Sequence, residues 1–173
     1  MNTQAIEESG MRFGPFPSDN VFYIEKSRCY QRIRTGVKMA EFLLLRNQSS
    51  GPVVWIVEAK SSSPRPETQP DFAGFIREIE EKFTNAFMLG MAAQLKRHPD
   101  AVEELSSAFQ EPDLGRQDVR FVLVIRGYEK PRLVPIREAL ERAMRVVVRV
   151  WKLAPSSVLV LNEDMARQYG LMR

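Results

Sequence analysis

The sequence predicts an α/β fold in which helices flank a mixed β-sheet. Residues 37–46 and 53–59 are two strand-like runs joined by the turn-forming residues 47–52, which indicates a β-hairpin. Residues 119–125 are an almost unbroken apolar run, as expected for a central strand buried on both faces. Residues 71–97 keep the three-and-four apolar spacing of an amphipathic helix, which must cover the sheet.

Length and composition indicate a single domain spanning residues 1–173. With 173 residues, 44% of them hydrophobic, the chain can bury one substantial core. One cysteine excludes an internal disulfide framework, and with one histidine a zinc site would need mainly carboxylate ligands. The first ten residues lack the pattern of a signal peptide, and no apolar run approaches the roughly 20 residues of a membrane helix. We therefore expect a cytoplasmic protein with no membrane partner.

The residues before the hairpin give weaker patterns. Residues 1–18 are polar and then interrupted by glycine and prolines, which predicts a loosely ordered N-terminal arm. Residues 20–29 carry apolar side chains too densely to show a clean period, so helix and strand both stay open and helix is favoured. Either residues 30–33 form a very short first strand, or the core of the sheet is trimmed.

Helices follow the hairpin. Asp71 is placed to cap the long helix, and a shorter helix is expected over residues 100–109. Residues 135–152 predict a further helix with Pro135 near its first turn, although the three valines at 146–148 are poor helix formers.

The last elements are short. Residues 157–161 predict a strand, and Asn162 is expected to cap a small helix that ends at Gly170. The predicted order is therefore helix, hairpin, long helix, strand, helix and strand.

Charged side chains meet at the end of the second hairpin strand. Glu58 and Lys60 are two residues apart, so a strand projects both from one face at the point where the apolar run stops. Glu41 lies on the preceding strand. Carboxylates are the hard oxygen ligands that Mg²⁺ prefers, with Mn²⁺ as a substitute, and Lys60 is placed to orient or deprotonate an attacking water. The alternative is a solvent-facing ion pair at a strand end, which contributes little.

Three stretches resemble the PD-(D/E)XK nuclease superfamily: Ile24-Glu25-Lys26-Ser27, Glu41-Phe42 and residues 57–64, Val-Glu-Ala-Lys-Ser-Ser-Ser-Pro. More narrowly, they look like a group of small stand-alone bacterial proteins. The resemblance covers residues 20–127 and implies a restriction-endonuclease-like fold with an αβββαβ core. It also implies Glu41 and Glu58 as metal ligands, Lys60 as the motif lysine, and Glu25, on the first helix, as an auxiliary metal ligand.

The chain departs from the superfamily pattern at four points. Position 41 holds glutamate where aspartate is commoner, and no Pro-Asp pair precedes it. The interval between Glu25 and Glu41 barely accommodates both a helix end and a separate first strand. The Gln-x-x-x-Tyr motif of the RecB-like branch is absent downstream.

Basic residues offer candidate contacts to a nucleic-acid backbone. Lys82 lies at the edge of the apolar stripe of the long helix, where it either reaches substrate or extends over the core. Three arginines in the later helix share a face by their spacing: Arg142, Arg145 and Arg149. Acidic residues at the start of that helix make a solvated amphipathic surface the competing interpretation.

Two functional hypotheses follow. The first is a Mg²⁺-dependent nuclease, with DNA favoured over RNA as the substrate and with sequence specificity from its loops, a homodimer or a protein partner. The second is a nuclease-like fold that binds nucleic acid or protein without turnover. The net charge of +3 permits a polyanionic partner without requiring one. Glycine-rich nucleotide loops and the Gly-x-Ser-x-Gly motif are absent.

Overall fold

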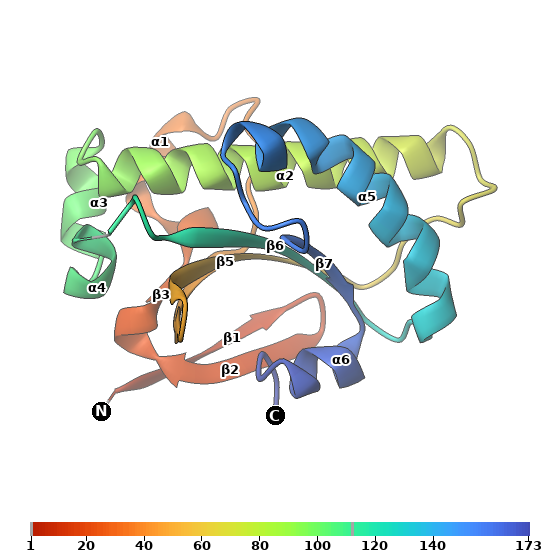
Figure 1. Cartoon of the computed structure of the whole chain (residues 1–173), viewed down its shortest axis with the longest axis horizontal. Helices are drawn as coiled ribbons and strands as arrows, with labels where there is room; N and C mark the ends of the chain where they lie inside the picture. The colour runs from red at the N-terminus through yellow and green to blue at the C-terminus, as the bar shows by residue number, and fades with distance from the viewer. Residues whose placement is uncertain (1, 112) are drawn as a thin grey trace.

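A five-stranded mixed sheet forms the centre of the computed structural model, which describes residues 2–111 and 113–173 (Figure 1). The spatial order of its strands is β3 (Val21–Phe22), β4 (Phe42–Gln48), β5 (Gly51–Lys60), β6 (Asp118–Ile125) and β7 (Val158–Leu161). The β3–β4 and β4–β5 pairs are antiparallel, whereas β5–β6 and β6–β7 are parallel. The predicted α/β class, with a mixed sheet flanked by helices, is confirmed.

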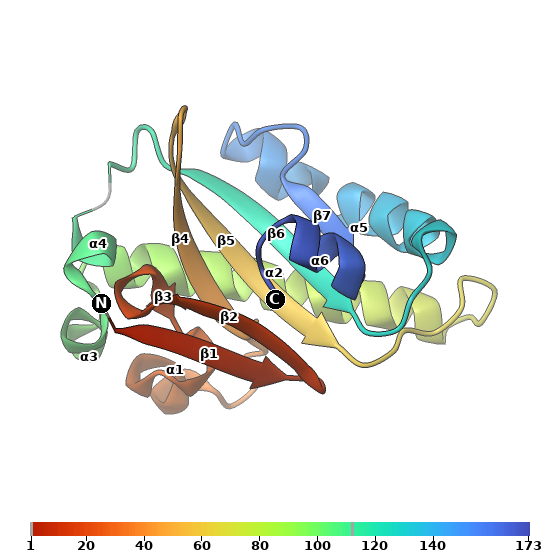
Figure 2. The ribbon, with the colours of Figure 1, turned by 90° about the horizontal axis from the view of Figure 1, so that it is seen from below.

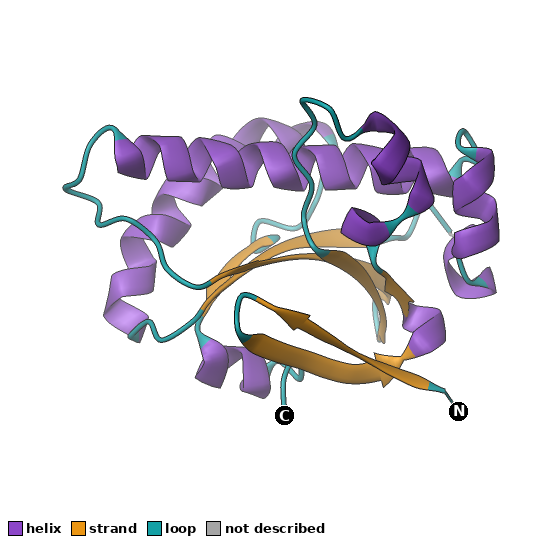
Figure 3. Cartoon of the chain, turned by 180° about the vertical axis from the view of Figure 1, so that it is seen from behind, coloured by secondary structure: helices purple, strands orange, loops and turns teal. Residues whose placement is uncertain are grey.

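Helices form one layer over this sheet, and a separate hairpin lies on the opposite face (Figure 3). The long helices of the upper layer are α2 (Asp71–Gln94) and α5 (Lys130–Val150). The opposite face carries a two-stranded hairpin, β1 (Thr3–Glu8) and β2 (Met11–Pro17), together with α6 (Glu163–Gln168). Figure 2 shows this hairpin crossing beneath β4 and β5, with α6 beside it.

Strand alternation divides the apolar residues into two cores. Successive side chains of a strand point to opposite faces, so Ile56 packs under the helices while Val57 packs against the hairpin and α6. The same alternation in β6 places Leu123 with the helices and Val124 with the hairpin. The continuous apolar run of β6 therefore reflects burial on both faces, as predicted.

The N-terminal residues form the β1–β2 hairpin, so the predicted loose arm over residues 1–18 is wrong where the structure describes it. Ser9 and Gly10 both have positive φ (52° and 73°), as a tight two-residue hairpin turn requires. Four apolar side chains of the hairpin are buried: Ile6, Met11, Phe13 and Phe16. Glycine and proline misled the prediction because they are tolerated in edge strands, which leave part of the backbone unpaired.

The favoured helix over residues 20–29 is also wrong. Val21 and Phe22 instead pair with Leu44 and Leu43 as the short strand β3. A 3₁₀ turn follows at Ile24–Lys26, and α1 (Arg28–Ile33) begins after Ser27, whose Oγ accepts a hydrogen bond from the Tyr30 N–H. The alternative strand at 30–33 is therefore wrong as well.

The element order consequently differs from the αβββαβ order at one point. Helix α1 lies between β3 and β4 instead of before the first strand of the sheet. The hairpin, long helix, strand, helix and strand that follow appear in the predicted order.

The boundaries of the later helices differ from the predicted boundaries. The helix expected over 100–109 is divided into α3 (Pro99–Glu104) and α4 (Ser107–Gln110), because Leu105 is extended (ψ 131°) and buried. Helix α5 starts at Lys130, five residues earlier than expected, with Pro131 in its first turn. Asn162 caps α6 as predicted, and its Oδ1 accepts a hydrogen bond from the Met165 N–H. No helix within residues 2–111 and 113–173 combines the length and apolar character that crossing a bilayer requires.

Phe13→Ala tests the packing of the hairpin. Phe13 is fully buried and packs edge-on against Phe42, with ring centroids 5.5 Å apart. We expect the free energy of unfolding in urea to fall by about 3–5 kcal/mol, as for other large-to-small core substitutions. Phe13→Leu, which keeps most of the apolar volume, should cost clearly less. Equal stability of all three proteins would show that the hairpin does not pack on the sheet.

Candidate metal and catalytic site

The pairing of β4 with β5 brings the two predicted carboxylates together. Glu58 and Lys60 lie at the carboxyl end of β5, on the face that α2 covers. Glu41 immediately precedes β4, and its N–H donates a hydrogen bond of 3.0 Å to the Val57 carbonyl. Because β4 and β5 are antiparallel, the start of one lies beside the end of the other. Glu41 and Glu58 are therefore neighbours, as the sequence predicts.

Glu58 is a fully buried carboxylate held by two lysines. Its Oε1 accepts a hydrogen bond from Lys82 Nζ at 2.7 Å and lies 3.4 Å from Lys60 Nζ. Its Oε2 is buried and has no hydrogen-bond partner in the described part of the chain. Such an oxygen is costly to bury, and it is free to accept a further ligand.

Helix α2 contributes Lys82 and a further carboxylate, Glu78. Lys60 Nζ donates to Glu78 Oε1 at 2.7 Å, so Lys60 lies between two carboxylates. The side chain of Lys82 is only 15% exposed, which places it inside the site on Glu58 instead of on the surface expected for a substrate contact. The sequence alone does not single out Glu78, although its spacing of four residues from Lys82 places both on one face of α2.

A second group of carboxylates lies around Glu41. Glu25, in the 3₁₀ turn after β3, donates its N–H to the Glu41 carbonyl at 3.3 Å. Glu8, at the end of β1, reaches the same place from the hairpin. One carboxylate oxygen from each of these three residues lies within 4.8 Å of the others. The structure thus brings Glu25 to Glu41, as predicted, and adds Glu8, whereas Glu58 is not a member of this group.

Crowding of carboxylates perturbs Glu41. Burial, the charge of Glu58 and hydrogen bonding to Glu25 raise the pKa of Glu41 to about 9. Without a cation the carboxyl group of Glu41 is therefore protonated at neutral pH. A bound cation would favour the ionised form instead.

Opposing effects act on Glu58 and Lys82. Burial raises the pKa of Glu58, while the nearby ammonium groups of Lys82 and Lys60 lower it. Burial alone would lower the pKa of Lys82, but Glu58 outweighs this effect and the pKa of Lys82 is raised. The raised Glu58 pKa favours a neutral acid, whereas the raised Lys82 pKa favours an ion pair. We take the pair as ionised, because two ammonium groups lie within 3.4 Å of one buried carboxylate.

The arginines predicted to contact substrate lie on a separate surface. All three are exposed on α5: Arg142, Arg145 and Arg149. Arg142 shares a groove with Ala73 and Arg77 of α2. Because successive helical residues are rotated by about 100°, Glu78 and Lys82 lie on the other side of α2. The structure therefore does not bring these arginines to the carboxylates.

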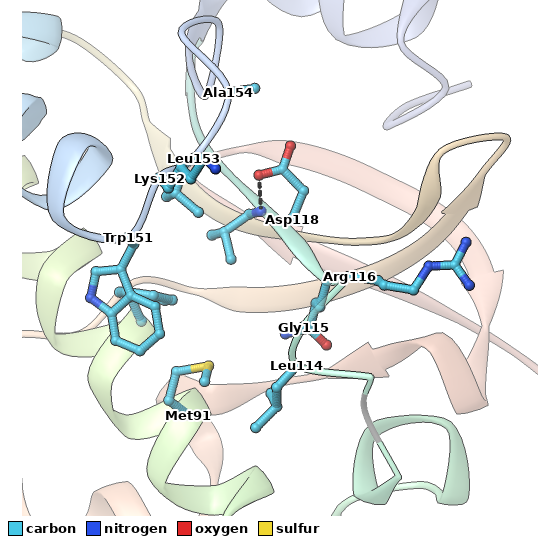
Figure 4. Close-up of a pocket in the computed structure, with 12 residues that line it drawn as sticks. Met91, Leu114, Gly115, Arg116, Asp118, Trp151, Lys152, Leu153 and Ala154 are labelled. Atoms are coloured by element: carbon cyan, nitrogen blue, oxygen red, sulfur yellow. Dashed lines mark hydrogen bonds between the residues drawn. The ribbon is translucent and has the colours of Figure 1, made fainter.

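A pocket of about 330 Å³ lies at the opposite end of the sheet (Figure 4). Met91 of α2 and Trp151 at the end of α5 line it, together with Asp118 at the start of β6. The carboxylates instead lie at the carboxyl end of β5, the edge at which α/β sheets commonly bind their ligands. We therefore place the candidate site at the carboxylates.

The donor set suits a hard divalent cation. It consists of converging carboxylate oxygens from Glu8, Glu25 and Glu41. Glu41 Oε2, and Glu58 Oε2 on the neighbouring strand, are buried without a hydrogen-bond partner in the described residues. Oxygen ligands of this kind fit Mg²⁺ or Mn²⁺, and the site includes no thiolate or imidazole that would favour zinc or copper. Lys60, 24% exposed beside them, is the amine nearest to solvent among the two lysines on Glu58.

Comparison of the chain with protein-family models, curated proteins and solved structures found no match.

Glu41→Gln should change how stability depends on pH. The folded-state pKa of about 9 exceeds the ordinary value of 4.5, so the folded protein binds the proton more tightly than the unfolded chain does. This contribution to the free energy of unfolding is complete below about pH 4.5 and is lost as pH rises to about 9. In EDTA, wild type should lose more stability than Glu41→Gln between pH 5 and 9, measured by urea unfolding. Parallel curves would contradict a protonated Glu41.

Lys82→Met should be strongly destabilising, because it leaves Glu58 buried with a single, more distant ammonium group. We expect a loss of about 3–5 kcal/mol in the free energy of unfolding. The double variant Glu58→Gln with Lys82→Met should recover much of this loss. As a control, Lys38→Met removes the exposed ion pair of Lys38 with Glu81 and should cost less than about 1 kcal/mol. A small effect of Lys82→Met would mean that Glu58 is not an anion.

Proposed function

We propose that this protein hydrolyses phosphodiester bonds of nucleic acid with Mg²⁺ as cofactor, and that DNA is the substrate. The observation that carries the proposal is the pair of carboxylates Glu41 and Glu58 on adjacent strands. Each ends in a buried oxygen without a partner in the described part of the chain, and Lys60 lies beside Glu58. The preference for DNA rests on the sequence resemblance to the PD-(D/E)XK superfamily.

Each residue has a distinct part in this proposal. Glu41 and Glu58 would hold the cation, with Glu25 next to Glu41. A bound Mg²⁺ supplies charge that stabilises the phosphorane-like transition state and lowers the pKa of a coordinated water. Lys60 Nζ is partly exposed and hydrogen-bonded to Glu78, which fixes the amine where it can orient the attacking water or stabilise negative charge. Lys82, on α2, holds Glu58 in position through its hydrogen bond to Oε1.

One observation favours the alternative of a non-catalytic binding or regulatory module. Glu58 has no exposed surface, and Lys82 and Lys60 already compensate its charge without a cation. A site that had lost metal binding would retain such an ion-pair network. The two functions are separated by Mn²⁺ titration of the purified chain, since the alternative predicts no carboxylate-dependent binding.

A nuclease assay of Lys60→Ala tests the catalytic proposal. Wild type should cleave plasmid, linear duplex or single-stranded DNA in Mg²⁺ or Mn²⁺ and lose this activity in EDTA. Lys60→Ala should reduce the cleavage rate by about a hundredfold or more, the usual range for a residue that assists proton transfer. Lys96→Asn is the matched control, because it removes an exposed lysine that lies just after the C-terminal end of α2. Asparagine tolerates the positive φ of 58° at this position.

Two outcomes would contradict the proposal. Equal cleavage by wild type and Lys60→Ala would show that the nuclease activity does not arise at this site. Absence of cleavage by wild type on DNA and RNA, under conditions in which Mn²⁺ binds, would show that the metal site does not hydrolyse nucleic acid.

A further inference from the structure

We propose that Glu8 of the N-terminal hairpin is a direct ligand of a divalent cation of the Mg²⁺ or Mn²⁺ class, bound together with Glu25 and Glu41. This inference rests on the proposed metal site and deepens it. It makes the hairpin, which lies outside the part of the chain that resembles the nuclease superfamily, a structural component of the site.

Strand alternation and the hairpin turn fix the position of Glu8. Ile6 and Glu8 are two residues apart on β1 and point to the same face, and Ile6 is buried against the sheet. The next residue, Ser9, donates its Oγ hydroxyl to the Ala59 carbonyl at 2.9 Å. This bond joins the hairpin turn to the end of β5, between Glu58 and Lys60. Glu8 is thus held at the site by apolar packing on one side and by a hydrogen bond on the other.

Further contacts hold the hairpin from the opposite side. Gly14, with a φ of 85°, donates its N–H to the Leu171 carbonyl at 2.8 Å. Phe13 forms an isolated antiparallel bridge with Met172. The arginine side chain of Arg126 lies so close to Gly10 that a Cβ there would meet its guanidinium at 2.4 Å. A ligand carried by such an anchored element is preorganised.

The group of three carboxylates shows a second, independent indication that a cation is missing. Glu41 is only 6% exposed, and its Oε2 is buried with no hydrogen-bond partner in the residues described. Glu58 Oε2, on the neighbouring strand, is buried and unpaired in the same way. Lone pairs of carboxylates buried away from water are normally satisfied. One such oxygen within the group of three carboxylates, and a second on the neighbouring strand, indicate that a cation belongs there.

Protein cations do not fill this role. Among the described residues, the group of three carboxylates has one ion-pair partner, Lys26, whose Nζ lies 3.4 Å from Glu8. The side chain of Lys26 is 63% exposed, so it can move into solvent at little cost when a metal ion binds. Glu8 is 20% exposed and gives the cation a route from solvent to the more deeply buried Glu41.

Mn²⁺ titration of the EDTA-treated full chain tests the assignment. Calorimetry on wild type should show one site, and Glu8→Gln should bind at least about tenfold more weakly, because affinity for hard cations depends on the number of carboxylate ligands. Glu7→Gln is the matched control: Glu7 is the exposed neighbour on β1, points to the other face, and should bind Mn²⁺ as wild type does. Circular dichroism and the thermal midpoint establish that each variant is folded.

Glu8→Asp separates coordination from charge. It keeps the negative charge but shortens the side chain by one methylene, so direct coordination predicts weakened binding in this variant also. In the wild-type protein, Mn²⁺ should broaden the backbone amide resonances of Glu8, Ser9 and Gly10 in nuclear magnetic resonance spectra. Wild-type affinity in Glu8→Gln overturns the proposal, and so does wild-type affinity in Glu8→Asp, which would show that charge alone matters.

The Mn²⁺ titration of the Glu8 variants and the nuclease assay test separate proposals. Glu8-dependent Mn²⁺ binding without cleavage of any substrate supports the metal site and contradicts the nuclease. Cleavage with Mn²⁺ binding that is unaffected by Glu8→Gln supports the nuclease and overturns the role of Glu8. If wild type binds no Mn²⁺, both proposals fail.

Discussion

The ion pair between Glu58 and Lys82 is the interaction on which the site depends. A carboxylate without exposed surface requires opposite charge nearby, since burying it alone would cost several kcal/mol. Lys82 meets this requirement from α2, which connects the helix to β5 at this point. The helix also places Glu78 against Lys60. Two ion pairs thus connect α2 to the end of β5 at the candidate site.

From this point the site becomes progressively more open. Glu58 is closed off by lysines, Glu41 is nearly buried beside it, and Glu8 is 20% exposed at the rim. The inner carboxylate is neutralised by protein ammonium groups, whereas the outer carboxylates have one exposed lysine between them. Lys26 supplies the one protein cation on the outer side, so protonation of Glu41 would compete with the proposed binding of a metal ion.

The sequence predicts the centre of the fold better than its edges. Strands β5 and β6 and helix α2 contain long runs of apolar residues. The spacing within each run fits only one type of secondary structure. Strand periodicity and the pairing of the hairpin strands predict that Glu41, Glu58 and Lys60 lie close together. They do not predict the position of Glu8, because its approach depends on a hairpin whose prolines and glycines resemble a loop. β3 is only two residues long, which is too short to show an alternation of apolar and polar residues. Its pairing with β4, and not its local sequence, defines it as a strand.

The docking of the hairpin has a consequence for the order of folding. β2 is held by Leu171 and Met172, which lie more than 150 residues later in the sequence than Gly14 and Phe13. Contacts of such separation carry a large loop-closure entropy and form late. During synthesis, β1 and β2 leave the ribosome before the C-terminal segment, so they can pack on Phe42 and Ala59 well before their contacts with Leu171 and Met172 form. The hairpin that carries Glu8 therefore gains these last contacts only after all the carboxylates of the candidate site have been synthesised.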